Sequence, residues 1–166
     1  WYRGAPWLLL LRPFEYLYRS VISVRRALYR YRVLRVYRSS LPVVVVGNVT
    51  VGGTGKTPTV IALVEALAAE GLQVGVLSGG FAAAAHLPAH LVGAHSAAAS
   101  SGDEALLVWQ RTGATVAVAK QRALGARLLE QHGVDLILCD DGLQHYALDR
   151  DIEIVVIDGQ RRSGNN

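Results

Sequence analysis

The sequence predicts an α/β fold in which helices cover both faces of a parallel β-sheet. Short β-branched runs, typical of buried parallel strands, alternate with longer segments of helical periodicity. A glycine-rich segment ending in Gly55-Lys56-Thr57 lies between the first such strand and the first such helix of the core. That context is the one a phosphate-binding loop requires. We therefore predict the fold of a P-loop NTPase, with ligand bound at the carboxyl ends of the strands.

The elements follow one another in a regular alternation. The expected strands cover residues 43–46, 73–77, 115–119, 134–139 and 152–157, and the expected core helices cover residues 58–70, 103–112 and 121–132. Residues 82–101 are rich in Ala, Ser and His without a clear period, so we expect a loop there. We divide the chain into a helical arm, residues 1–38, and a P-loop core, residues 39–166.

The arm is basic and aromatic. It holds nine of the 17 basic residues and one of the 13 acidic residues, so it carries +8 while the rest of the chain carries −4. A helix over residues 13–38 is predicted, because apolar residues recur every three or four positions at Leu17, Val21, Val24, Leu28 and Tyr31. Arginines beside Tyr and Trp are typical of a helix lying in a lipid headgroup layer.

Two other interpretations of the arm stay open. It could be an amphipathic helix packed on its own core, or a nucleic-acid contact, which we rank third because no zinc spacing or nucleic-acid module is present. The uncharged run of residues 4–11 is too short to span a bilayer, which needs roughly 20 apolar residues. We expect no nucleic-acid partner.

Two features of composition add expectations. Cys139 is the single cysteine, so no internal disulfide forms, and we expect a buried thiol in a reducing compartment. The chain begins at Trp1, contains no Met and ends in a loop-like sequence. We therefore expect a fragment of a longer protein.

The phosphate-loop segment assigns a physical role to each residue type. Glycines at positions 52, 53 and 55 let backbone N–H groups close around phosphate oxygens, and the positive end of the following helix faces the same anion. Lys56 would meet the β- and γ-phosphates, and Thr57 would offer a hydroxyl to Mg²⁺. Pro58 suits the first turn of the helix. The expected nucleotide-binding residues here are Thr50, Val51, Gly52, Gly53, Thr54, Gly55, Lys56 and Thr57, with Thr50 where the motif usually has Gly.

A second polar segment follows the strand expected at residues 134–139. Asp140 is the first choice for holding Mg²⁺, because P-loop proteins place an acid at the end of such a strand. Asp141 could orient the metal shell or the attacking group, and Gln144 and His145 could contact phosphate or substrate. A solvent-exposed Asp-Asp-Gly turn is the alternative, and the preceding apolar strand favours the functional interpretation.

A third segment, Gly102-Asp103-Glu104, opens an expected helix. Two acids at a helix N-terminus are favoured by the helix dipole alone, and the sequence does not exclude that reason for their presence. A P-loop kinase also needs a group near the accepting hydroxyl, so Asp103 is a candidate general base. The isolated histidines show no ligand spacing and are expected in loops or at the surface: His86, His90, His95 and His132.

With these motifs in place, the chain resembles the tetraacyldisaccharide 4′-kinase family, the lipid A kinases of Gram-negative bacteria. The string Asp-Asp-Gly-Leu-Gln-His combined with a phosphate loop that begins with Thr is highly specific to that family. The resemblance covers the whole chain but only about the N-terminal half of such a kinase. The segments that carry it are residues 45–58, residues 102–104, residues 140–146 and Asp158-Gly159-Gln160-Arg161.

The resemblance implies transfer of the γ-phosphate of ATP to the 4′-hydroxyl of an acylated glucosamine disaccharide 1-phosphate, giving lipid IVA. It implies ATP and Mg²⁺ as cofactors and a peripheral position on the cytoplasmic face of the inner membrane. Lys56 and Thr57 would hold phosphate and Mg²⁺, and Asp103 would be the base. Four further residues would surround metal and phosphate: Glu104, Asp140, Asp141 and His145.

One loop departs from the family pattern. Where the family usually has Ser-Arg-Gly-Tyr-Gly, this chain has Ser78-Gly79-Gly80-Phe81-Ala82, which removes a cation and a tyrosine hydroxyl. A histidine that is thought to pair with the family's base belongs to the C-terminal half. We therefore expect residues 1–166 alone to bind Mg·ATP but to transfer phosphate poorly or not at all. Robust lipid phosphorylation by these residues would contradict this expectation.

Two rival functions remain from the sequence. The first is another P-loop enzyme, such as a GTPase or ATP-dependent ligase, although the chain lacks a guanine-reading Asn-Lys-x-Asp string. Competition between ATP and GTP would separate these. The second is a non-catalytic ATP-binding module on a membrane, which predicts lipid binding without phosphate transfer even in the full-length protein.

Overall fold

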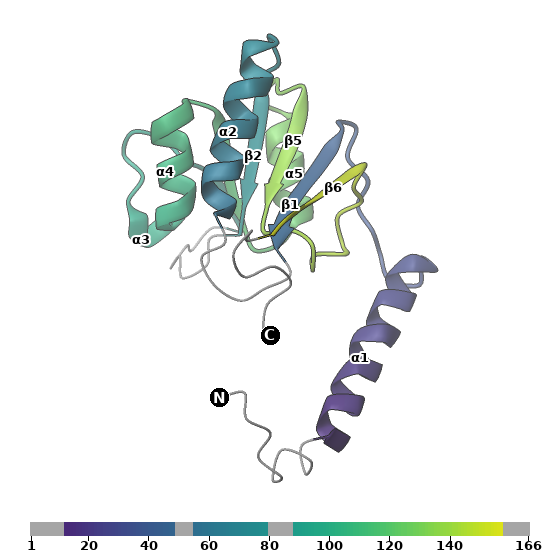
Figure 1. Cartoon of the computed structure of the whole chain (residues 1–166). Coiled ribbons are helices and arrows are strands. Elements are labelled where there is room, and N and C mark those ends of the chain that lie inside the picture. The colour runs from purple at the N-terminus through teal and green to yellow at the C-terminus, as the bar shows by residue number, and fades with distance from the viewer. Residues whose placement is uncertain (1–11, 49–54, 80–87, 158–166) are drawn as a thin grey trace.

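The computed structural model describes residues 12–48, 55–79 and 88–157. A six-stranded sheet forms its centre, and one long helix extends away from that sheet (Figure 1). In chain order the elements are α1 (Arg12–Arg30), β1 (Val43–Asn48), α2 (Lys56–Ala69), β2 (Val74–Ser78), β3 (Ala89–Leu91), α3 (Ala98–Ser101), α4 (Asp103–Thr112), β4 (Thr115–Ala119), α5 (Arg122–Glu130), β5 (Leu136–Asp140) and β6 (Ile152–Val156).

The sheet has the strand order β3-β4-β2-β5-β1-β6. All neighbours run parallel except the short edge strand β3, which is antiparallel to β4. The predicted parallel α/β sheet is therefore confirmed for five strands, and β3 makes the sheet mixed. In the register of β1 and β5, Val46 pairs with Asp140. Because parallel strands end at the same edge, the segments that follow β1 and β5 emerge side by side.

Helices cover both faces of the sheet, as predicted. Along β1, Val43 and Val45 pack in the core cluster that contains α5, while Val46 packs in the cluster that contains α2 and α4. This alternation is the period-two pattern of a strand whose two faces are both buried. Cys139 is 1% exposed and packs on the α5 side, which confirms the expected buried thiol.

The arm helix differs from its prediction. α1 ends at Arg30, whereas we predicted a helix through residue 38. Arg32 then adopts a left-handed backbone with φ 56°. Tyr37 is extended instead: its N–H donates to Ala147 O at 2.8 Å, and its carbonyl accepts from Asp149 N at 2.8 Å. These hydrogen bonds to the core replace the helical ones, which local periodicity could not reveal.

The side chains that follow α1 hold the chain to the end of α5. Tyr37 Oη donates to Glu130 Oε2 at 2.7 Å, and Ser39 Oγ donates to Glu130 Oε1 at 2.6 Å. α1 itself contains no buried residue. None of the helices in the described ranges combines the length and the apolar character that crossing a bilayer requires.

The segment predicted as a loop, residues 82–101, contains two regular elements. β3 pairs along the edge of β4, and α3 precedes α4. His90 is on β3, half-buried, with its Nε2 3.3 Å from Ser101 Oγ. The prediction was wrong there because a three-residue strand and a four-residue helix are too short for a period to appear. Residues 82–87 lie outside the described residues.

The packing of α5 on the sheet yields a stability prediction. A Cβ at Gly125 would lie 2.9 Å from Ala119 Cβ and would also meet the Leu77 side chain, which is fully buried. Overpacking a core costs about 1–3 kcal/mol, and the upper half of that range applies here because both contacts would be closer than side chains tolerate. Ala in a helix is favoured over Gly by about 1 kcal/mol, which offsets part of this cost. We expect Gly125→Ala to lower the free energy of unfolding by about 1–2 kcal/mol in urea denaturation. Gly93→Ala is the control, because nothing lies within 4 Å of its Cβ. Equal stability of the two variants would contradict this packing.

Candidate functional site

A cavity of about 790 Å³ opens at the carboxyl edge of the sheet. Side chains from the first turns of α2 and α4 line it together with residues at the ends of β2, β4 and β5. Its size matches the usual range of ligand pockets, and charged groups of both signs face it. The lining residues are Lys56, Ser78, Gly79, Ser101, Gly102, Asp103, Glu104, Ala105, Lys120, Arg122, Asp140, Asp141, Gln144 and His145.

Most of the expected site residues that the structure describes meet at this cavity. Seven of them line it, although they come from three separate segments of the chain: Lys56, Asp103, Glu104, Asp140, Asp141, Gln144 and His145. Gly55 and Thr57 adjoin Lys56 at the start of α2 but are not among the lining residues. The predicted nucleotide-binding residues Thr50, Val51, Gly52, Gly53 and Thr54 lie outside the described residues, as does residue 158 onward.

Lys56 and Asp141 form an ion pair at the cavity. Lys56 Nζ lies 2.8 Å from Asp141 Oδ1. Gly55, with φ 77°, directs the chain into α2 so that Lys56 occupies its first turn. Asp141 also has a left-handed backbone, with φ 51°, which turns the chain sharply away from β5. An anionic phosphate oxygen would compete with this carboxylate for the Lys56 ammonium.

Asp140 is a buried carboxylate with one oxygen that lacks a hydrogen-bond partner among the described residues. The residue is 4% exposed, and its Oδ1 has no hydrogen-bond partner among the described residues. Burial raises the pKa of Asp140 to about 6, and the negative charge of Glu104 adds to the rise against the positive charge of Lys56. A buried acceptor without a donor is unfavourable unless a cation or another ligand approaches it.

This donor chemistry fits a hard cation such as Mg²⁺, which prefers carboxylate and hydroxyl oxygens. Within residues 12–48, 55–79 and 88–157, no group of three or more His, Cys, Asp or Glu side chains has the arrangement of a metal site. A single carboxylate is nevertheless a sufficient protein anchor for Mg²⁺, because this ion commonly keeps several waters and takes substrate phosphates as ligands.

Arg122 is a pocket residue that the sequence reasoning missed. It is 4% exposed and bridges two strand ends, donating from Nη1 to Leu77 O at 3.2 Å and from Nη2 to Asp140 O at 2.8 Å. Gly79 leaves room for it, because a Cβ there would lie 3.0 Å from Nη2. Lys120 also lines the cavity. Both cations follow β4 directly, and cations at the carboxyl end of a parallel strand were the signal that could have identified them.

The remaining lining residues have distinct environments. Burial, followed by the positive charge of Arg122, lowers the pKa of His145, which favours a neutral imidazole near pH 7. Asp103 and Glu104 occupy the first turn of α4, after Gly102 with φ 83°. Both acids are exposed and line the cavity. The positive end of the α4 dipole stabilises their negative charges, whether or not they also bind a ligand.

Together, the mostly parallel sheet, the lysine at the start of α2 and the acids after β5 define a protein of the P-loop NTPase-like α/β class. The family model for LpxK, tetraacyldisaccharide-1-P 4′-kinase, matches residues 7–166. The chain belongs to this family, which confirms the resemblance found from the motifs.

Individual relatives agree with the family match. A tetraacyldisaccharide 4′-kinase from Aeromonas hydrophila is 53% identical over 99% of this chain, and one from Ectopseudomonas mendocina is 51% identical over 99% of it. The chain spans about half the length of these curated relatives. The crystal structure of the "apo" form of LpxK from Aquifex aeolicus in complex with ATP superposes with a TM-score of 0.78. It is 32% identical, and the match covers 87% of this chain and 47% of that one.

The environment of Asp140 yields a prediction on stability and pH. A carboxyl with a folded pKa near 6 and an unfolded pKa near 4 destabilises the fold when ionised. The penalty is absent below about pH 4, grows as pH rises to about 6 and is complete above that. We expect Asp140→Asn to raise the free energy of unfolding by about 1–3 kcal/mol at pH 7.5 without Mg²⁺, and by little at pH 4.

Thermal and urea denaturation at the two pH values measure this effect. Asp141→Asn is the matched control, because the same change at the neighbouring carboxylate removes an ion pair to Lys56 and relieves no comparable burial. An Asp140→Asn variant that is less stable than wild type at pH 7.5 would contradict the assignment of Asp140 as a buried carboxylate whose charge is not compensated.

Proposed function

We propose that the intact protein is an ATP-dependent kinase that phosphorylates the 4′-hydroxyl of tetraacyldisaccharide 1-phosphate, forming lipid IVA. The observation that carries the proposal is the convergence of Lys56, Asp140 and Asp103 on one cavity, in a chain of this family. Relatives over 50% identical carry the name tetraacyldisaccharide 4′-kinase, and the similar solved structure holds ATP.

The proposed roles follow from charge and position. The phosphate loop would bind the phosphates of ATP through residues 50–55, and Lys56 would leave Asp141 to neutralise the β- and γ-phosphates. Thr57 and Asp140 would hold Mg²⁺, which when bound neutralises charge on the transferring phosphoryl group. Glu104, Gln144 and His145 would contact the nucleotide or its metal shell from the cavity wall.

Asp103 is the proposed general base for the accepting hydroxyl. It lines the cavity at the start of α4 and is exposed, so an acceptor from solvent or from a membrane can reach it. Asp141 also lines the cavity, and loss of its Lys56 partner to phosphate would leave a free carboxylate to orient the attacking group. Catalysis would then consist mainly of positioning and charge neutralisation.

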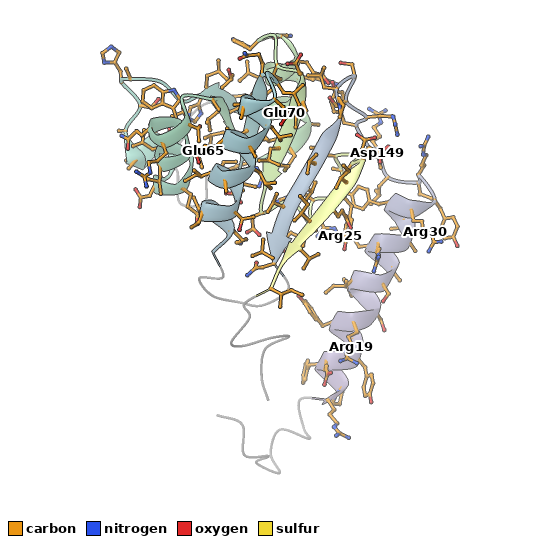
Figure 2. The ribbon with its side chains drawn as sticks, turned by 45° about the horizontal axis from the view of Figure 1, so that its top comes forward. Arg19, Arg25, Arg30, Glu65, Glu70 and Asp149 are labelled. Carbon is orange, nitrogen blue, oxygen red and sulfur yellow. The ribbon has the colours of Figure 1, made fainter. Side chains whose placement is uncertain are left out.

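The arm, residues 1–38, is proposed to dock the P-loop core, residues 39–166, on the cytoplasmic face of the inner membrane. Large apolar side chains on α1 remain more than half exposed, including Phe14 at 68% and Leu17 at 62%. Figure 2 shows Arg19, Arg25 and Arg30 along the same helix. A helix with unburied apolar groups among arginines has the chemistry of an anionic bilayer surface, where an acylated glucosamine disaccharide phosphate would reside.

Replacing Lys56 tests the enzyme directly. In the intact protein, Lys56→Ala should lower kcat/KM for phosphate transfer from [γ-³²P]ATP to the disaccharide lipid at least about 100-fold, because it removes the cation on the transferring phosphate. Asp103→Asn should lower kcat and leave ATP binding nearly unchanged, since a base acts only in the chemical step. Arg111→Ala, an exposed cation at the far end of α4, is the control.

The same assay separates the rival functions. Phosphate transfer from GTP as efficient as that from ATP would favour another class of P-loop enzyme. Binding of the lipid without any transfer by the wild-type intact protein would favour a non-catalytic membrane module. Full activity of Lys56→Ala would contradict the proposed site.

A further inference from the structure

Arg150 makes an unusual set of hydrogen bonds from a position outside the cavity. Its Nη1 donates to Leu143 O at 3.2 Å and to Gly142 O at 3.4 Å, and its Nη2 donates to His145 O at 3.0 Å. Nη1 also pairs with Glu153 at 2.9 Å. The Arg150 side chain is only 12% exposed. One guanidinium therefore donates hydrogen bonds to three carbonyls of residues 141–145, the segment that contains Asp141, Gln144 and His145.

That segment, residues 141–145, belongs to no helix or strand. Backbone polar groups in irregular segments must find partners outside a regular ladder. Asp141 is also in a left-handed conformation, which is unfavourable by roughly 1–2 kcal/mol for a residue with a side chain. The surroundings must hold such a segment in place, and Arg150 contributes by donating from two nitrogens to three of its carbonyls.

The chemistry of the donor set requires arginine. A guanidinium presents five N–H groups in a rigid plane, so it reaches several carbonyls at once, whereas a lysine ammonium is a compact and strongly hydrated charge. The same guanidinium lies 5.6 Å from the centre of the Tyr146 ring. Tyr146 in turn contacts Tyr29 of α1, with ring centres 5.9 Å apart. The last turn of α1 therefore contacts Tyr146, the residue that follows His145.

We propose that Arg150 is a positioning residue that holds residues 141–145 in the geometry the nucleotide cavity needs. This inference rests on the proposed function, because it assigns a supporting residue to that same site. Arg150 is not among the residues that line the cavity. It acts through the backbone of Leu143 and His145, and so sets where the Asp141 carboxylate and the His145 ring lie relative to Lys56.

The test compares variants of the intact protein by Mg·ATP affinity and by kcat and KM for lipid phosphorylation. We expect Arg150→Ala to remain folded, to bind Mg·ATP about 10-fold more weakly and to lose about 10–100-fold in kcat/KM, since small displacements of catalytic groups have effects of this size. Arg150→Lys should recover little of the lost affinity and activity. It restores the positive charge but not the planar set of N–H donors that reaches several carbonyls at once. Millimolar guanidinium chloride should partly restore Arg150→Ala.

Two controls separate positioning from general structure. Arg111→Ala removes an exposed arginine in the last turn of α4, away from residues 141–145, and it should behave as wild type. Glu153→Gln removes the ion pair of Arg150 while leaving its carbonyl bonds possible, and its kinetics should change less than threefold. Should Arg150→Ala fail to fold, Arg150→Lys decides the question.

Three outcomes would overturn the proposal: wild-type kinetics in Arg150→Ala, wild-type kinetics in Arg150→Lys, or a loss in Arg150→Ala that guanidinium does not relieve. Failure of the proposed function can be distinguished from failure of this inference. If the wild-type protein transferred no phosphate, Mg·ATP affinity measured by calorimetry would still show whether Arg150 positions the site.

Discussion

The parallel pairing of β1 with β5 is the constraint on which the site depends. With Val46 opposite Asp140, the two strands end together. The phosphate-loop segment follows β1. Asp140 is the last residue of β5, and Asp141 comes directly after it. The 2.8 Å contact between Lys56 and Asp141 is a consequence of that register. A slip of one residue would turn Asp140 to the other face of the sheet and separate the acids from Lys56.

Side-chain packing then fixes the irregular segment after β5. Gly47 lies under Leu143 so closely that a Cβ there would approach Leu143 Cγ to 2.6 Å. Arg150 holds the carbonyls of the same segment from outside. Just before this segment, Arg122 links the last residue of β5 to the neighbouring strand β2 through Asp140 O and Leu77 O. These contacts keep a carboxylate oxygen of Asp140 buried at the cavity without a hydrogen-bond partner among the described residues. That arrangement lowers stability but suits the binding of a cation.

The sequence predicted those parts of the molecule that local patterns determine. The β-branched runs predicted the buried strands, and the segments around Lys56, Asp103 and Asp140 predicted residues that do meet at one cavity. The end of α1 could not be predicted, because Tyr37 leaves the helix to pair with Ala147 and Asp149, which are distant in sequence. Arg150 was missed because its partners are backbone carbonyls of an irregular segment, and no periodic pattern in the sequence reveals that geometry. Arg122 was missed although its position just after β4 was a usable signal.

The most direct test of the account is a crystal structure of the intact protein with Mg²⁺ and a non-hydrolysable ATP analogue. The β- and γ-phosphates should occupy the cavity at the carboxyl edge of β1 and β5. Lys56 Nζ should be within hydrogen-bond distance of a phosphate oxygen and no longer paired with Asp141. A nucleotide bound elsewhere, or a Lys56–Asp141 pair that persists with the analogue in place, would contradict the assignment of this cavity as the site of phosphate transfer.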